Sequence, residues 1–193
     1  MTERVEREVV AELGVQPQRA SVTFLGVEPI DVLRFVVGDD LVHVTVGCAR
    51  HPMTDPDDLA PDPLRGPRAE LVVRMHADTP LPGLHTAMAT LAAAPAVEGL
   101  VLVPDALVDL GEPLWSGSSC TAVLLTEDEL PDVALDEPRE PVRFVRAVPI
   151  TANEAAWVRL RGADALRDVW GQAGIDVRSA RRTSANVGGG AAN

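Results

Sequence analysis

Residues 32–46 of the chain read Val-Leu-Arg-Phe-Val-Val-Gly-Asp-Asp-Leu-Val-His-Val-Thr-Val, which is two apolar runs separated by a short polar turn. The turn, residues 38–40, has the length of a β-hairpin connection, so we predict antiparallel strands over residues 32–37 and 41–46. Successive side chains of a strand point to opposite faces of the sheet. In the second strand we expect one face to hold Val42, Val44 and Val46, and the other to hold Leu41, His43 and Thr45.

Further strands are predicted on both sides of this hairpin. Runs rich in Val and Leu and bounded by Gly, Pro or Asp occur at residues 21–27, 69–75, 100–103, 121–125 and 142–148. Two stretches between them are expected to be irregular, residues 52–67 and 104–120. The first holds five prolines, which exclude a regular element and predict a long exposed loop.

Two helices are predicted in the first half of the chain. Residues 2–13 have apolar side chains at helical spacing, with Thr2 as the N-cap and Gly14 as the stop signal. Residues 84–94 are rich in Ala and Leu, which suits a helix packed closely on a sheet. We expect that helix to end before Pro95, because proline disfavours the helical conformation of the residue before it.

Two more helices are predicted near the C-terminus. Residues 151–154, Thr-Ala-Asn-Glu, form a capping box that starts a helix. After a break at Gly162, residues 163–173 continue as a second helix. Residues 184–193 contain three consecutive glycines and are expected to be a flexible tail. The large side chains expected on the buried faces of these helices are Trp157, Leu160 and Trp170.

Composition limits the classes of function. The 193 residues are 46% hydrophobic, enough for one globular domain with its own core. A formal charge of −12 repels phosphate backbones and anionic membrane surfaces, so nucleic acid is not an expected partner. The apolar runs are far shorter than the roughly 18 residues of a membrane-spanning helix. Two cysteines and a polar start predict a cytoplasmic protein whose cysteines are small buried side chains.

The sequence holds no strong catalytic, metal or nucleotide motif. Residues 117–120, Gly-Ser-Ser-Cys, lack the spacing of a nucleophile elbow. A thiol nucleophile at Cys48 or Cys120 would need a histidine beside it, which a sequence cannot show. The aspartates of residues 55–62 lack the glycine and the terminal glutamate of a calcium loop. The glycine run 188–190 neither follows a predicted strand nor opens a helix. We therefore predict no catalytic residue, metal or cofactor.

A family resemblance adds to this interpretation, and it covers most of residues 20–183. Residues 30–32 followed by 41–48 (Leu-Val-His-Val-Thr-Val-Gly-Cys) are similar to the "idV…tyvTvGms" strands of the Suppressor of fused domain family. Residues 68–71, Arg-Ala-Glu-Leu, resemble the "r.aEL" strand that follows them in that family.

The second half of the chain continues the resemblance in the same order. Residues 111–118 and 121–125 resemble the irregular loop and apolar strand in the middle of the domain. Residues 149–154 and 162–166 are similar to the "piT..E" and "GadaLl" helices, and the match ends at residues 182–184. The order and spacing of these segments carry the resemblance, because each fragment alone is common.

The resemblance implies an α+β fold, in which a mixed, largely antiparallel β-sheet is flanked by helices. We expect one such domain over residues 1–183, and the strand and helix pattern agrees with it. The resemblance also implies a protein-binding module and not an enzyme. The animal family member accepts a short segment of a transcription factor as an added β-strand between two lobes, and this chain is long enough for the first lobe only.

For bacterial single-domain relatives, the resemblance implies immunity proteins that neutralise cognate toxins. Our first hypothesis is thus a cytoplasmic module that sequesters a protein partner, such as a basic toxin, because complementary charge speeds encounter. Two alternatives stay open: a hydrolase using Ser119 or Cys120, and a structural subunit of a larger assembly. The predicted contact surface consists of Asp55, Asp57, Asp58, Asp62 and Trp115.

Overall fold

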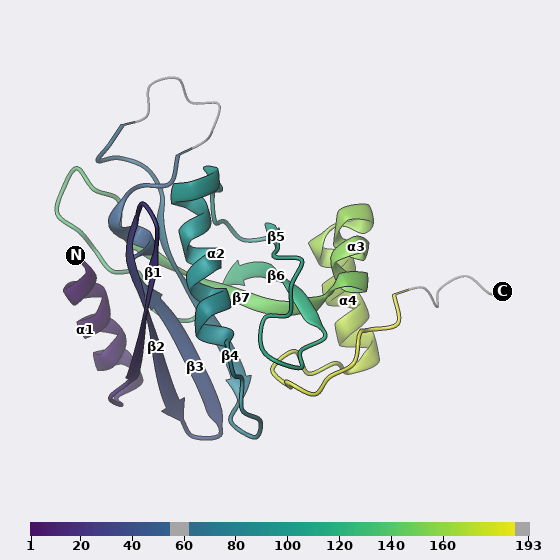
Figure 1. Ribbon diagram of the computed structural model, residues 1–193. Coiled ribbons are helices and arrows are strands. Elements are labelled where there is room, and N and C mark those ends of the chain that lie inside the picture. Colours follow the sequence, from purple (N-terminus) through teal and green to yellow (C-terminus); the bar gives the residue numbers. More distant parts are fainter. Residues whose placement is uncertain (55–61, 188–193) are drawn as a thin grey trace.

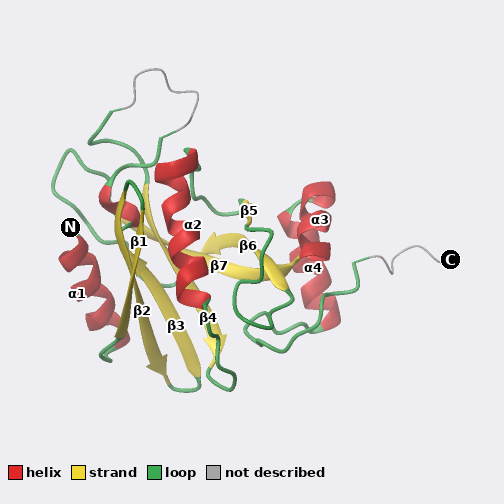
Figure 2. Cartoon of the chain, in the orientation of Figure 1, coloured by secondary structure: helices red, strands yellow, loops and turns green. Residues whose placement is uncertain are grey.

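We describe the protein from a computed structural model, which covers residues 1–54 and 62–187. In this part of the chain, no helix is long and apolar enough to cross a membrane. Figures 1 and 2 show a single sheet with helices against it. The helices are α1 (Thr2–Leu13), the short 3₁₀ helix η1 (Cys48–Arg50), α2 (Leu84–Glu98), α3 (Ala152–Arg161) and α4 (Ala163–Ala173).

The sheet has seven strands in the order β1-β2-β3-β4-β7-β6-β5. Among the described strands, only the central pair, β4 and β7, is parallel, and the other neighbours are antiparallel. This confirms the predicted α+β fold with a mixed, largely antiparallel sheet. The strands are β1 (Gln18–Phe24), β2 (Val27–Val37), β3 (Asp40–Val46), β4 (Arg68–His76), β5 (Leu107–Asp109), β6 (Cys120–Glu127) and β7 (Val142–Thr151).

The hairpin predicted from residues 32–46 is present as β2 and β3. Its loop is one residue shorter than expected, because Val37 pairs with Asp40 and leaves only Gly38 and Asp39 unpaired. Gly38 has a φ of 59°, in the left-handed region that two-residue hairpin turns require. The expected alternation of faces is confirmed, since Val42, Val44 and Val46 all lie in the core cluster that includes α1.

The two faces of the sheet are covered by different helices. Ile30 and Val32 of β2 pack in the cluster that holds the buried side of α2, whereas Leu33 and Phe35 pack with Val5 and Val9 of α1. In β7, Val148 and Ile150 pack with α3 and α4, while Val145 and Ala147 face the α2 side. The helix α2 therefore covers one face, and α1 and the α3–α4 pair cover opposite ends of the other (Figure 2).

Some local predictions in the first half of the chain were wrong. Met1, not Thr2, is the N-cap of α1, and its side chain makes no capping hydrogen bond. Helix α2 continues through Pro95 to Glu98, because a proline in the last turn removes only one amide donor and the helix stays packed on the sheet. Residues 100–103 form no strand, since β6 already pairs with β7 on one side and with β5 on the other.

The capping box at Thr151 is confirmed, because its hydroxyl accepts from the Glu154 amide and the Glu154 carboxylate accepts from the Thr151 amide. The prediction for Leu160 was wrong, since 78% of it is exposed. Helix α3 instead buries Glu154, Ala155 and Val158, and Trp157 is only partly buried. Trp170 of α4 is buried, as predicted.

The chain after α4 folds back onto the domain. The amide of His76 donates to the Arg178 carbonyl, which joins this segment to the end of β4. The Ser184 hydroxyl lies 2.9 Å from that of Thr151, and the Ala185 amide donates to Glu154. These two residues were expected to belong to the flexible tail, so the packed part of the chain extends beyond residue 183. Residues 188–193 of the expected tail lie outside the described residues.

Candidate functional site

The structure separates the five predicted contact residues. Trp115 is only 5% exposed and belongs to the core cluster under α2, so it offers almost no surface to a partner in the folded protein. Asp62 is exposed, and its carboxylate accepts the amides of Leu64 and Arg65 at 2.8 and 3.1 Å. The remaining three, Asp55, Asp57 and Asp58, lie outside the described residues, and the acidic loop stays a prediction.

The residues of the hydrolase alternative are poorly arranged for catalysis. Ser119 is exposed, but none of the hydrogen bonds found among the described residues joins it to a histidine. Cys120 is buried, and burial raises the pKa of its thiol. Burial likewise raises the pKa of the Cys48 thiol. Since the thiolate is the nucleophilic form, these environments disfavour both cysteines as nucleophiles.

Two buried carboxylates have structural partners. Glu70 accepts the amides of Gly47, Cys48 and Ala49 and the hydroxyl of Thr45, so it holds the turn that follows β3. Burial raises the pKa of Glu70 to about 7, in opposition to these hydrogen bonds. Glu154, which caps α3, likewise accepts a backbone amide, that of Thr151. Both carboxylates are buried, so neither faces a binding surface.

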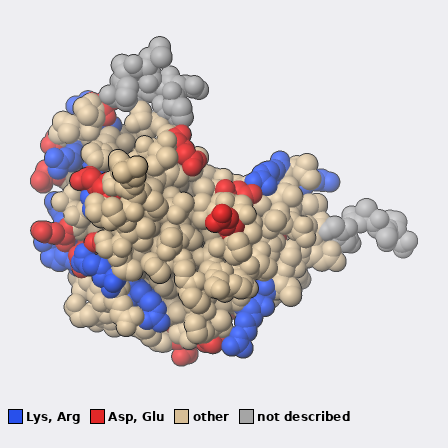
Figure 3. Space-filling model, viewed as in Figure 1, with Lys and Arg blue, Asp and Glu red and all other residues tan. Residues whose placement is uncertain are grey.

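Charges of both signs are interspersed on the face of the molecule seen in Figure 3, where the described residues form no continuous acidic area. In the described chain as a whole, several arginines form ion pairs, for example Arg19 with Glu6 and Asp31, and Arg74 with Asp128. The described part of this face thus gives no acidic binding surface of the kind expected from the net charge.

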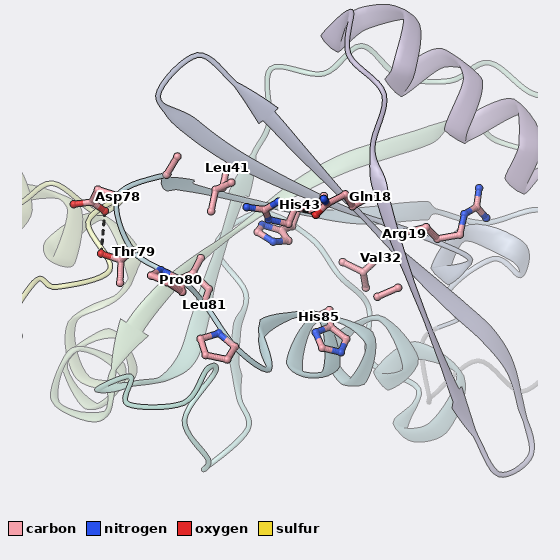
Figure 4. Close-up of a pocket in the computed structure, with 14 residues that line it drawn as sticks. Gln18, Arg19, Val32, Leu41, His43, Asp78, Thr79, Pro80, Leu81 and His85 are labelled. Carbon is pink, nitrogen blue, oxygen red and sulfur yellow. Dashed lines mark hydrogen bonds between the residues drawn. The ribbon is translucent and has the colours of Figure 1, made fainter.

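A pocket of about 510 Å³ lies between the first three strands and the start of α2, and we call it the β1–α2 pocket. Figure 4 shows His43 extending from β3 toward the side on which α2 carries His85. Strand residues on the α2 side of the sheet form one wall, and the loop that leads into α2 forms the other. Its lining residues are Gln18, Arg19, Ala20, Val32, Arg34, Leu41, His43, Ala77, Asp78, Thr79, Pro80, Leu81, Pro82 and His85.

A row of polar side chains crosses this pocket. Gln18 pairs with Arg34 in the sheet register, and Arg34 pairs with His43, so the three residues stand side by side on three strands. The guanidinium of Arg34 donates to the Gln18 side chain at 2.9 Å. Burial, and then the electrostatic effect of Arg34 and His85, lower the pKa of His43 to about 4, so the His43 ring is neutral at pH 7.

Beside this pocket, β1 forms an edge of the sheet. It pairs with β2 over residues 18–24 and has no strand on its other side within the described residues. The opposite edge strand, β5, is only three residues long. Next to the end of β1, Leu25 is fully exposed at the tip of the β1–β2 hairpin. An open edge of this length can pair with an added strand.

This pocket was not predicted from the sequence. The alternation in residues 41–46 correctly placed His43 on the face away from the valines, but the pairing with Arg34 and Gln18 depends on the register of three strands. The loop 77–82 gave no signal that it would form a wall.

The fold is that of a Suppressor of fused domain. The chain belongs to the Suppressor of fused protein (SUFU) family, whose family model matches residues 26–183. This confirms the resemblance noted in the sequence. Among curated protein sequences, none matches this chain.

Solved structures show the same fold at low sequence identity. A SUFU-like protein from Neisseria gonorrhoeae FA 1090 is 18% identical, with a TM-score of 0.66 over 95% of this chain and 96% of that chain. A chain in the crystal structure of the Sufu–Fu complex is 14% identical, with a TM-score of 0.64 over 95% and 91%. Drosophila Suppressor of Fused is also 14% identical, with a TM-score of 0.62 over 94% of this chain. This chain spans only half of the Drosophila protein.

Proposed function

We propose that this protein is a non-enzymatic module that sequesters a protein partner in the cytoplasm, as an immunity protein sequesters a toxin. The observation that carries the proposal is the open edge of β1 on a Suppressor of fused domain. One of the structures with this fold is a complex, that of Sufu with Fu. Binding at a sheet edge needs no catalytic group.

The edge of β1 offers the two features that binding by strand addition uses, which are backbone hydrogen-bonding groups and a neighbouring apolar side chain. In an antiparallel pair, successive residues of a strand direct their amide and carbonyl groups alternately toward the partner strand and away from it. About half of the backbone groups of β1 therefore face away from β2, where no other strand among the described residues pairs with them. The exposed side chain of Leu25 supplies an apolar contact at the end of the same edge. Main-chain pairing gives affinity in this mode, and neighbouring side chains give specificity.

The chemistry of the described residues argues against a hydrolase. The pKa values of both thiols are raised by burial, and Ser119 has no hydrogen-bonded histidine among these residues. In the same part of the chain, no cluster of three or more His, Cys, Asp or Glu side chains is placed to hold a metal ion.

The net charge favours a basic partner. At −12, the protein attracts a positively charged protein at long range, which raises the association rate at low salt. The predicted acidic loop with Asp55, Asp57, Asp58 and Asp62 would concentrate this charge. A toxin that acts on nucleic acid would have the matching basic surface.

The test is affinity purification of the tagged protein from its native host at low and high salt, with bound proteins identified by mass spectrometry. Two proline variants, Ala20→Pro and Ser21→Pro, locate the contact. Because neighbouring amides point to opposite sides of β1, one proline removes a hydrogen bond to β2 and the other removes only an amide at the open edge.

The proline at the open edge is expected to leave the melting temperature close to that of the wild type but to abolish partner recovery. Ser21→Ala keeps the backbone donors and is the matched control that retains the partner. Leu25→Ser tests the same edge without a backbone change, in case both proline variants unfold. Partner recovery that is unchanged in the folded edge variants contradicts binding at β1, and recovery of the bare protein at both salt concentrations contradicts sequestration.

The proposal that the partner is a toxin and the alternative of a structural subunit have separate tests. If the partner is a toxin, its production alone is expected to stop growth of a bacterial culture, and co-production with this chain is expected to restore it. A mass measurement in solution that shows a stable assembly of many subunits would instead favour a structural subunit.

A further inference from the structure

Among the described residues, the lining of the β1–α2 pocket includes an arginine without a counter-ion and a histidine with an unpaired ring nitrogen. Its volume of about 510 Å³ is in the range of small-molecule sites, roughly 300–1,000 Å³. Part of its wall is apolar and comes from Val32, Leu41 and Leu81. The other part is the polar row described above, so the pocket has the mixed lining that orients a ligand with one polar end.

Arg34 is a cation without a counter-ion. Among the described residues its guanidinium makes one side-chain hydrogen bond, to the neutral Gln18, and no salt bridge. The other arginine of the lining, Arg19, differs because Glu6 and Asp31 neutralise it. Asp78 is the carboxylate in the lining, and its side chain accepts from Thr79 at 3.0 Å. No salt bridge among the described residues neutralises the guanidinium of Arg34, which lines the pocket.

His43 is the second polar group of this pocket. Its side chain is only 5% exposed, and the atom Nδ1 is fully buried with no hydrogen-bond partner among the described residues. A buried N–H without an acceptor costs more than a buried lone pair without a donor, so the neutral ring places its proton on Nε2. His43 is one of the lining residues, so Nε2–H is the donor that its ring can offer to a ligand in the pocket.

The start of α2 adds positive potential to the same space. Gly83 is its N-cap, no side chain caps the helix, and its first turn holds no acidic residue. The N-terminal end of a helix carries a partial positive charge that favours anions. His85, in that first turn, lines the pocket together with Arg34 and His43. Three independent features thus favour a negative group at one place.

We propose that the β1–α2 pocket binds the carboxylate of a small organic acid, with Arg34 and His43 as its donors and the acid's apolar part against Val32, Leu41 and Leu81. A planar carboxylate matches the two parallel N–H groups of a guanidinium, and such charge-assisted pairs are the stronger hydrogen bonds of proteins. This ligand site lies on the α2 face of the sheet, and it does not depend on whether a partner strand binds the edge of β1.

The test is an NMR titration of the ¹⁵N-labelled protein with sodium benzoate. Benzamide, which has the same ring but no charge, is the matched ligand control, and acetate tests the contribution of the apolar part. The variants are Arg34→Gln, His43→Phe and the control Arg161→Gln. Arg161 is an exposed residue of α3 outside the pocket.

Benzoate is expected to shift amide signals of β1–β3 and residues 77–85 and to saturate, while benzamide has little effect and acetate binds more weakly. Arg34→Gln is expected to weaken benzoate binding about tenfold or more, because it removes a charge-assisted pair. Arg161→Gln should bind as the wild type does. If Arg34→Gln does not fold, His43→Phe tests the same carboxylate contact. Equal responses to benzoate and benzamide, shifts without saturation, or unchanged affinity in a folded pocket variant would overturn the proposal.

Discussion

Substitution of Glu154 by glutamine tests how the C-terminal segment is held. The carboxylate is fully buried and accepts hydrogen bonds from Arg182 at 2.7 and 2.9 Å, from the Trp170 indole at 3.0 Å and from the Ala185 amide at 3.2 Å. It also accepts the Thr151 amide at 2.8 Å, at the start of α3. One side chain therefore joins two helices to the segment that follows them.

The expected loss of stability in Glu154→Gln follows from the burial of both charges. The side chain of Arg182 is only 6% exposed, so Glu154→Gln leaves a buried guanidinium without its counter-ion. Removal of one partner of a buried pair costs about 3–5 kcal/mol of the free energy of unfolding. For a domain of this size, each kcal/mol lowers the melting temperature by about 2–4 °C. The expected decrease is thus about 6–20 °C.

The assay is a double-mutant cycle with Glu154→Gln, Arg182→Gln and both together, followed by urea unfolding at pH 7. Because the second substitution removes the charge that the first leaves unpaired, the double variant is expected to lose clearly less stability than the sum of the single variants. Leu160→Ala, at an exposed position of α3, is a control for substitution in the same helix.

The pH dependence provides a second measurement. Burial, the largest influence, raises the pKa of Glu154, but the hydrogen bonds from Arg182, Thr151 and Trp170 together lower it more. The stabilisation is therefore complete above the ordinary pKa of 4.5 and is lost as the pH falls through the lower pKa of the folded state. If Glu154→Gln lowers the free energy of unfolding by only about 1 kcal/mol, as loss of a helix cap alone would, this account is refuted. Additive losses of stability in the double-mutant cycle would refute it as well.

Three further predictions concern other parts of the protein. The hydrogen bond to Asp176 is the largest influence on His76 and raises its pKa above 6.5; desolvation opposes this, and the hydrogen bond to Asp40 adds to it. NMR should show that the pKa of His76 falls in the variant Asp176→Asn. The stabilisation from protonated His76 is complete below pH 6.5 and is lost as the pH rises through the raised pKa, so unfolding measured across that range should show this decline. Native Cys120 should react with a thiol reagent far more slowly than in denaturant, and equal rates would contradict its burial. Leu166→Ala should cost about 2–5 kcal/mol, whereas a comparable loss for an exposed leucine of α3 would contradict the packing of the helix pair.

The relation between sequence and structure differs along the chain. Where one short segment carries the signal, the prediction was confirmed: the hairpin of residues 32–46 and the capping box at Thr151 depend on contacts within a few residues. Residues 100–103 have the composition of a strand, but a strand also needs a free neighbour, and β5 occupies that edge of β6. Leu160 fits a helical period, yet only the direction from which the sheet meets α3 decides which side is buried.

The candidate sites show the same division. The sequence by itself determined the fold class, the family and the charge, because these depend on the order of apolar runs, turns and capping residues. Only the tertiary structure buried Trp115, left β1 at an open edge, and aligned Gln18, Arg34 and His43 across three strands. The physical reason is that exposure and side-chain proximity arise from strand register and from packing between segments far apart in the chain, which no local pattern specifies.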